Sequence, residues 1–244
     1  MADLPDQHAQ EGSAKTAGIN WRAAVGFLVL ILAVPAVLLL AAGRWDWWPA
    51  WVYFGLAVVC TVISRVIVMR RYPDLLVERS RYRESEGAKG WDRVLVPIVA
   101  SYGPLTVLLV AGLDERFGWP PRLPLALQFA ALLLLALGYA FSTWAMVVNR
   151  FFSAVVRIQK ERDHTVVTGG PYRFVRHPGY AGGLVADLAV PLLLGSLWAL
   201  VPAGLTMVGL VVRTALEDRT LREELPGYHD YARRTRYRLV PGIW

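Results

Sequence analysis

Charged residues and cysteine are both scarce in this chain. Asp, Glu, Lys and Arg make up only 18% of its 244 residues, whereas hydrophobic residues make up 55%. This leaves too little polar surface for a soluble globular protein of that length. Cys60 is the only cysteine and lies within an apolar tract, so the chain cannot form an intrachain disulfide. The composition predicts an integral membrane protein.

The chain also lacks the short motifs of common nucleotide and metal sites. It has neither a G-x-G-x-x-G loop after a strand nor a G-x-x-x-x-G-K-[ST] loop, so soluble-type dinucleotide and nucleoside triphosphate sites are unsupported. His164, His177 and His229 do not have the i, i+3 or i, i+4 spacing of helical metal ligands, and no cysteine lies near them. We therefore expect no bound metal.

Long apolar tracts set the predicted architecture. The last tract is too long for one straight crossing, and Pro191, Gly195 and Pro202 interrupt it. We expect this tract to form a helical hairpin that turns near Gly195. The prediction is an all-α, polytopic membrane protein with five to six transmembrane helices. The tracts, each long enough to cross a hydrocarbon core, cover about Trp21–Ala42, Trp48–Met69, Val94–Leu113, Leu123–Val148 and Tyr180–Val212.

Lys and Arg residues concentrate in alternate loops. They are dense after the second and fourth tracts and in the C-terminal region, whereas the opposite loops hold only Arg44, Arg116 and Arg122. Because cytoplasmic loops retain positive charge, this pattern predicts that both termini are cytosolic, with the protein in the inner membrane if it is bacterial. The same bias explains the net charge of +7 without a nucleic-acid partner. We expect a flexible cytosolic tail (1–20), four transmembrane helices (21–148) and a catalytic region (149–244).

The stretch TGGPYRFVRHPGYAGG, residues 168–183, places polar and turn-forming residues directly before an apolar segment. Pro178 suits the first turn of a helix, whose free N–H groups would offer a site for an anion. His177 then serves either as a ligand donor or as a cap for that helix. Tyr172 and Tyr180 suit either a binding site or the aromatic belt of the membrane interface.

A second polar cluster follows the hairpin. Arg213 and Glu217 are four residues apart, so they share one face of a helix about one turn above the bilayer. The pair is either part of a site or an ordinary helical ion pair.

The order of these motifs resembles the isoprenylcysteine carboxyl methyltransferase family and its phospholipid-methyltransferase relatives. The similarity runs over residues 149–244, through HTVVTGGPYRFVRHPGYAGG, an apolar hairpin, RTALEDRTL and GYHDYARR. It implies a cytosolic C-terminal pocket for S-adenosylmethionine and a lipophilic acceptor that arrives through the membrane lipids. The closest model is carboxyl methylation of a prenylated cysteine; in a bacterium, a small isoprenoid or lipid acid is the more plausible acceptor.

The resemblance also implies roles for individual residues. Arg213 matches the arginine that orients the substrate. A family glutamine falls on Arg157 here, and the nearest glutamine is Gln159, which we include as a candidate contact. The full set of expected cofactor contacts is Gln159, His164, Thr165, Val166, Val167, Tyr172, His177, Pro178, Gly179, Tyr180 and Glu217.

Two other activities stay open at this point. N-methylation of a phospholipid amine would need a base, and Arg213 would repel an ammonium group. The tail YRLVPGIW and the segment RHPGY are also similar to the C-terminal domain of membrane sterol reductases, which use NADPH. Those enzymes carry Asn where Gly179 stands. Binding of S-adenosylmethionine or of NADPH would distinguish these classes.

Overall fold

Helices account for all regular secondary structure in the part of the chain that the structure, a computed structural model, describes: residues 21–72, 74–75, 79 and 87–244. The expected tail over residues 1–20 lies outside this part. Two 3₁₀ turns, η3 (Lys160–Arg162) and η4 (Gly170–Arg173), interrupt the loop after the fourth long helix. The helices are α1 (Trp21–Ala42), α2 (Trp48–Arg71), α4 (Asp92–Pro97), the π-helical η2 (Ile98–Tyr102), α5 (Gly103–Phe117), α6 (Leu125–Val148), α7 (Pro178–Leu193), α8 (Leu200–Glu224) and α9 (Tyr228–Arg234).

Four helical stretches are long and apolar enough to cross a membrane: α2, the continuous stretch Asp92–Phe117, α6 and α8. Their outward side chains include Leu133 and Leu205, which are 62% and 70% exposed. An apolar surface of this kind is solvated by lipid. The chain is thus an integral membrane protein, as its composition predicts. α7 has 16 residues, so its length of about 24 Å falls short of a hydrocarbon core of about 30 Å.

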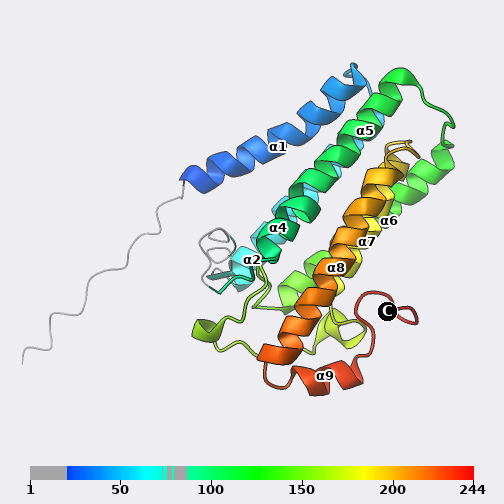
Figure 1. The fold of residues 1–244 in the computed structure, drawn as a ribbon. Helices are drawn as coiled ribbons and strands as arrows, with labels where there is room; N and C mark the ends of the chain where they lie inside the picture. Colours follow the sequence, from blue (N-terminus) through cyan, green and yellow to red (C-terminus); the bar gives the residue numbers. More distant parts are fainter. Residues whose placement is uncertain (1–20, 73, 76–78, 80–86) are drawn as a thin grey trace, which may run out of the picture.

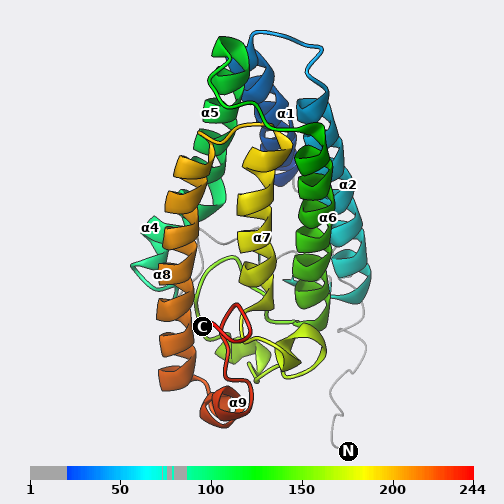
Figure 2. The ribbon, with the colours of Figure 1, turned by 90° about the vertical axis from the view of Figure 1, so that its right-hand side faces the viewer.

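The helices pack as a closed bundle. α1 contacts α2 and α5, α2 contacts α6, and α8 contacts α5. α7 lies between α6 and α8, as Figures 1 and 2 show. The predicted hairpin is confirmed: α7 and α8 are joined by a short turn in which Gly195 has φ +78°, a conformation that favours glycine.

α7 approaches α6 closely because glycines face each other across the contact. A Cβ atom on Gly182 would lie 2.5 Å from the carbonyl oxygen of Gly138 and 2.2 Å from Ser142 Oγ. Ser142 Oγ also donates a hydrogen bond of 2.9 Å to the carbonyl oxygen of Gly179. Small residues of this kind let helix backbones pack in a membrane. The contact fixes the first turn of α7 against α6.

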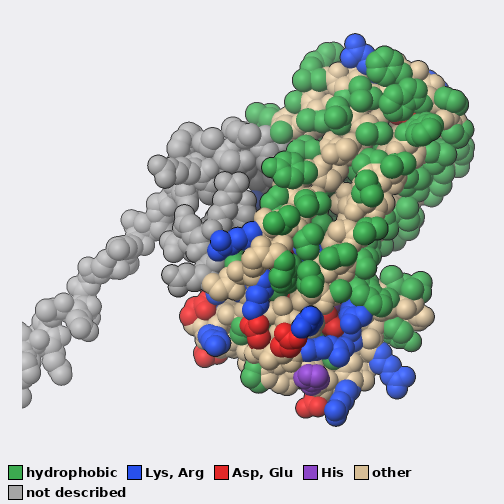
Figure 3. Space-filling model, in the orientation of Figure 1, with side chains coloured by type: hydrophobic (Ala, Val, Ile, Leu, Met, Phe, Trp, Pro, Cys, Tyr) green, Lys and Arg blue, Asp and Glu red, His purple; other side chains and the backbone are tan. Residues whose placement is uncertain are grey.

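Charged side chains gather at one end of the bundle. Figure 3 shows Lys, Arg, Asp, Glu and His side chains clustered at the end that carries α9, while hydrophobic side chains cover most of the rest of this face. The loop after α6, the start of α7 and the C-terminal segment meet there (Figure 2). This charged end is where the predicted site residues lie.

Candidate functional site

A cavity of about 110 Å³ opens at the charged end. Its walls come from the loop after α6, the first turn of α7, the last turns of α8, and α9. Most of the residues predicted from the sequence line it: His164, Val166, Val167, Tyr172, His177, Gly179, Tyr180 and Glu217. Residues up to 82 positions apart in the sequence, Asn149 and Tyr231, therefore meet around one space.

Four predicted residues do not line this cavity: Gln159, Thr165, Pro178 and Arg213. Gln159 is fully buried, and its side-chain amide donates to the carbonyl oxygen of Phe151 at 2.8 Å. Thr165 is exposed, and Pro178 is the buried first residue of α7. Arg157, by contrast, lines the cavity and pairs with Glu161 at 2.6 Å. The geometry thus brings Arg157, and not Gln159, to the cavity wall.

Tyr180 separates Arg213 from the cavity. Its hydroxyl donates a hydrogen bond of 2.5 Å to Glu217 Oε2 and accepts one of 2.5 Å from Arg213 Nη1. Its ring stacks on His177, with 5.9 Å between ring centroids and 5° between planes. The Arg213 guanidinium lies 5.1 Å from the centroid of the same ring. Among the described residues, Arg213 and Glu217 are linked through this hydroxyl, and their contact is not the ordinary helical ion pair.

Asp92 is the ion-pair partner of Arg213, and sequence reasoning did not identify it. Arg213 Nε and Nη2 donate to the two carboxylate oxygens of Asp92, at 2.7 Å and 3.2 Å, and Nη2 also donates to the carbonyl oxygen of Ala154 at 3.1 Å. Asp92 is fully buried and Arg213 is 6% exposed. An aspartate just before an apolar tract is typical of the first turn of a helix, so no local pattern indicates that it pairs with Arg213.

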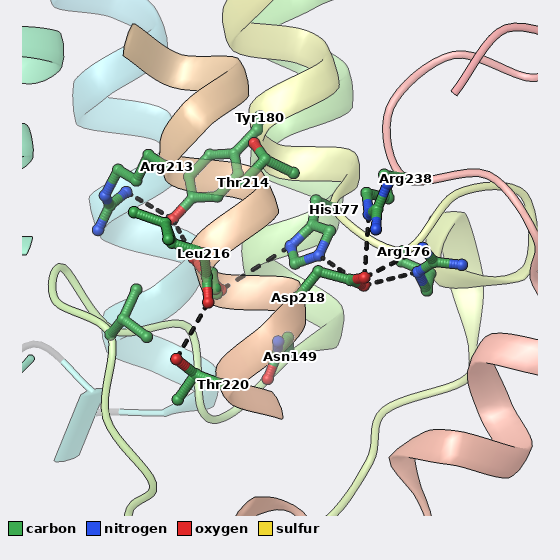
Figure 4. A network of polar contacts seen from close by, with 12 residues as sticks. Asn149, Arg176, His177, Tyr180, Arg213, Thr214, Leu216, Asp218, Thr220 and Arg238 are labelled. Atoms are coloured by element: carbon green, nitrogen blue, oxygen red, sulfur yellow. Dashed lines mark hydrogen bonds and ion pairs between the residues drawn. The ribbon is translucent and has the colours of Figure 1, made fainter. Parts of the chain in front are cut away.

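Asp218 is a second buried carboxylate that sequence reasoning missed. It accepts hydrogen bonds from Arg176 Nε at 2.7 Å, Tyr228 Oη at 2.9 Å and Arg238 Nε at 2.9 Å. His177 Nε2 lies 3.4 Å from Asp218 Oδ1. Figure 4 shows His177, Arg176 and Arg238 converging on this carboxylate. Asp218 therefore ties the start of α7 and the C-terminal segment to α8.

The start of α7 shows two features that bear on the expected roles. His177 makes no side-chain hydrogen bond that caps the helix, so the cap is the unsupported one of its two possible roles. The backbone N–H groups of Arg176 and His177, directly before the helix, donate to the carbonyl oxygens of Tyr237 and Arg238, both at 2.9 Å. The C-terminal segment uses these donors, and the His177 ring faces the cavity instead.

Two aromatic residues of the cavity wall are uncharged at neutral pH. Burial, helped by Arg162 and Arg157, lowers the pKa of His164 to about 4. Its Nδ1 accepts a hydrogen bond of 3.3 Å from the backbone N–H of Gln159. Burial raises the pKa of Tyr172 above its usual value. The cavity thus offers neutral rings beside the carboxylate of Glu217, whose side chain is 22% exposed.

This donor set fits a ligand with a cationic group and a planar ring, as S-adenosylmethionine has. Glu217 can pair with a cation, and the aromatic rings and Val166 can cover an adenine. The enclosed volume of about 110 Å³ is below the ~300 Å³ of small-molecule sites. A ligand of that size must extend beyond the enclosed part or displace lining side chains. In the described residues, no group of three or more His, Cys, Asp or Glu side chains is arranged to hold a metal.

A larger cavity, of about 240 Å³, lies at the opposite end of the bundle among the loops that follow α1, α5 and α7. It is lined by polar side chains such as Arg44, Glu115 and Gln128, and it contains none of the predicted site residues. We therefore assign the candidate site to the smaller cavity at the charged end.

Known proteins are similar to the part of the chain that builds this site. Residues 131–223 match the model of the isoprenylcysteine carboxyl methyltransferase family. The protein-S-isoprenylcysteine O-methyltransferase of Schizosaccharomyces pombe is 40% identical over 70 residues, covering 28% of this chain and 30% of that protein. The rat protein of the same name is 30% identical over 117 residues, covering 47% of this chain and 39% of that protein.

A relative with a different name is also similar. The cobalt-zinc-cadmium resistance protein CzcN of Cupriavidus metallidurans is 37% identical over 112 residues, covering 42% of this chain and 47% of that protein. The chain spans less than half the length of each of these relatives. The matched residues 131–223 include every predicted site residue, from Gln159 to Glu217.

Proposed function

Since residues 131–223 make this chain a member of the isoprenylcysteine carboxyl methyltransferase family, we propose that it transfers a methyl group from S-adenosylmethionine to the carboxylate of a lipophilic acceptor. The observation that carries this proposal is the position of Tyr180. One side of this residue faces a cavity in which Glu217 is the single carboxylate among the described lining residues, and the other side faces the buried cation Arg213. A cationic cofactor and an anionic acceptor would thus meet at one hydroxyl group.

S-adenosylmethionine supplies a methyl group on a positively charged sulfur, and a carboxylate oxygen needs no general base to receive it because carboxylates are ionised at neutral pH. The oxygen lone pair forms the new O–C bond, the electrons of the S–C bond stay on sulfur, and no proton moves. The residues of the site therefore have to bind the cofactor and the acceptor, orient them toward each other and exclude water. Glu217 would pair with the cationic part of S-adenosylmethionine, and the rings of Tyr172, His177 and Tyr180 would hold the remainder of the cofactor.

Arg213 would orient the acceptor with only part of its guanidinium. A guanidinium has five N–H groups. Three of them donate to Asp92 and Ala154, and one donates to Tyr180. Among the described residues one N–H of Nη1 has no acceptor, so the acceptor carboxylate would meet Arg213 at a single point beside the Tyr180 hydroxyl. The bidentate pair of hydrogen bonds that a guanidinium can donate to one carboxylate is made to Asp92.

The proposal extends to location and to the acceptor. Residues 149–244 would form the catalytic region, with both termini and the cavity on the cytosolic side. In a bacterium this membrane would be the inner membrane. The concentration of Lys and Arg in the loops at the charged end supports this orientation. The acceptor would be a prenylated cysteine or a smaller isoprenoid or lipid acid that enters through the bilayer.

Cofactor binding is the first test. Calorimetry on detergent-purified protein would compare S-adenosylmethionine with NADPH, for the wild type and for Glu217→Gln. The matched control is Glu223→Gln, which removes an exposed carboxylate of α8 that pairs with Arg219 at 2.7 Å. We expect S-adenosylmethionine to bind, Glu217→Gln to weaken it, and Glu223→Gln to have no effect. Binding of NADPH alone would contradict the proposal and favour a reductase.

The chemistry of the product is the second test. Membranes would be incubated with S-adenosylmethionine labelled in its methyl group and with N-acetyl-S-farnesyl-cysteine as the acceptor. A carboxyl methyl ester releases labelled methanol in base, whereas an N-methyl group stays on the product. We expect base-labile label. Stable label on phospholipid would instead identify an N-methyltransferase.

A further inference from the structure

We infer that Asp92 is a positioning residue for Arg213, and that it sets the direction of the one guanidinium edge that can reach an acceptor. The inference rests on the proposed function. Asp92 is the first residue of α4 and lies 121 positions before Arg213 in the sequence. It touches neither the cavity nor Tyr180 in the described contacts, so any effect on catalysis must pass through Arg213 or through the loop that it holds.

The geometry fixes Arg213 in two directions. The two hydrogen bonds from Nε and Nη2 to the Asp92 carboxylate hold the plane of the guanidinium, and the bond from Nη2 to Ala154 prevents rotation about the remaining axis. Only Nη1 then points toward Tyr180. Because Asp92 holds this arrangement in the protein itself, the acceptor does not have to order the arginine when it binds. This is preorganisation of a binding group.

Asp92 also holds the cavity wall. Its Oδ2 accepts a hydrogen bond of 2.7 Å from the backbone N–H of Val156, a residue that lines the cavity. The carbonyl oxygen of Val156 accepts a second bond, of 3.2 Å, from the backbone N–H of Lys89. One buried carboxylate therefore sets both the arginine on the acceptor side and a wall on the cofactor side.

The simpler alternative is that Asp92 only fastens the start of α4 to α8. The chain contains a contact that does this without touching Arg213. Lys89 Nζ pairs with Glu224 Oε1 at 2.5 Å, and both side chains are partly exposed, at 30% and 41%. Glu224→Gln removes this fastening and leaves Asp92 in place. It is the matched control for loss of a carboxylate that joins the same two segments.

The experiment compares Asp92→Asn, Asp92→Glu and Glu224→Gln in the full chain. Each protein is assayed for methylation of N-acetyl-S-farnesyl-cysteine, for calorimetric binding of S-adenosylhomocysteine, and for its melting temperature in detergent. We expect Asp92→Asn to lower kcat roughly 100-fold, the loss typical of a misplaced positioning group. The Kd of S-adenosylhomocysteine should change less than about threefold, because the amide oxygen of Asn can still accept the hydrogen bond from Val156. Glu224→Gln is expected to leave kcat within about twofold.

Asp92→Glu keeps the result interpretable if Asp92→Asn does not fold. It retains the charge that Arg213 needs but moves the carboxylate by one methylene, so it should fold and still lose kcat about tenfold. Equal effects of Asp92→Asn and Glu224→Gln, or full activity of Asp92→Glu, would overturn the positioning role.

A double-mutant cycle with Arg213→Lys separates positioning from fastening. Lys keeps the charge but lacks the planar fork. If Asp92 acts through that fork, adding Asp92→Asn to Arg213→Lys should lower kcat less than about twofold further. If the kcat of the double mutant instead falls by the product of the two single-mutant losses, the positioning role is overturned while the proposed function stays intact. A wild type that binds no S-adenosylhomocysteine and methylates nothing would overturn both.

Discussion

The Tyr180 hydroxyl donates a hydrogen bond of 2.5 Å to Glu217 Oε2, across the boundary between the cavity and the buried Arg213. Tyr180 belongs to the first turn of α7 and Glu217 to α8, and the two are 37 positions apart in the sequence. The same hydroxyl accepts a bond from Arg213. It therefore sets the distance between the carboxylate that would face the cofactor and the cation that would face the acceptor.

Tyr180→Phe is expected to reduce methyl transfer more than cofactor binding. Phenylalanine keeps the ring that stacks on His177 but loses both hydrogen bonds. A hydrogen bond to a charged group contributes about 1.5–3 kcal/mol, so kcat should fall at least roughly tenfold. Calorimetry should show a change of less than about threefold in the Kd of S-adenosylhomocysteine. Tyr102→Phe, at a position 66% exposed, serves as the control. Unchanged kcat in Tyr180→Phe would show that the hydroxyl has no role in transfer.

Substitutions of Arg213 and Glu217 should separate acceptor binding from cofactor binding. Arg213 does not line the cavity, whereas Glu217 does. We expect Arg213→Lys to lower kcat about 100-fold, since the planar fork is lost, while sparing cofactor affinity. Glu217→Gln should weaken both. Lys is preferred to Ala because removing the cation would leave the buried Asp92 carboxylate without its ion-pair partner, at a cost of about 3–5 kcal/mol. Equal losses of cofactor affinity, measured by calorimetry, would contradict this division of roles.

Local patterns in the sequence were enough to predict the helices and much of the site. Apolar tract length predicted the four stretches that are long and apolar enough to cross a membrane, while the total of five to six spans stays a prediction. The glycine between the prolines of the last tract predicted the hairpin turn at Gly195. Motif order predicted eight of the residues that line the cavity, from His164 to Glu217. Asp92 and Asp218 could not be predicted in this way, because their partners Arg213 and Arg176 lie 121 and 42 positions away. The burial of a carboxylate depends on the packing of several helices, which no local window contains.

The backbone donors available at the start of α7 could not be predicted for a related reason. The amides of Arg176 and His177 are free in an isolated helix start, as the sequence suggested. In the folded chain they are taken by the carbonyl groups of the C-terminal segment. Such competition between a ligand and another part of the same chain depends on tertiary structure.

His164 should make the protein less stable as the pH falls from about 6.5 to about 4. Burial lowers its pKa from 6.5 to about 4 in the folded state. Between these values the unfolded chain binds a proton that the folded chain does not, so stability is lost as the pH falls. Melting temperatures in detergent at pH 7.5 to 4.5 should therefore decline less steeply for His164→Gln than for the wild type. His229→Gln, at an exposed position in α9, controls for the loss of a histidine. Parallel declines for wild type and His164→Gln would exclude this origin.

Gly182→Ala should destabilise the bundle through the contact between α6 and α7. The new Cβ would lie 2.5 Å from the carbonyl oxygen of Gly138 and 2.2 Å from Ser142 Oγ, and a backbone oxygen cannot move aside without shifting its helix. Overpacking of this kind costs about 1–3 kcal/mol. Gly204→Ala is the matched control, because its Cβ would have no atom within 4 Å and α8 would gain helix propensity. Unfolding of the two variants in detergent would be followed by circular dichroism.

Because Ser142 also holds Gly179 at the start of α7, Gly182→Ala should weaken binding of S-adenosylhomocysteine as well. A variant that is destabilised but binds as tightly as the wild type would show that the α6–α7 contact supports the bundle without positioning the cavity.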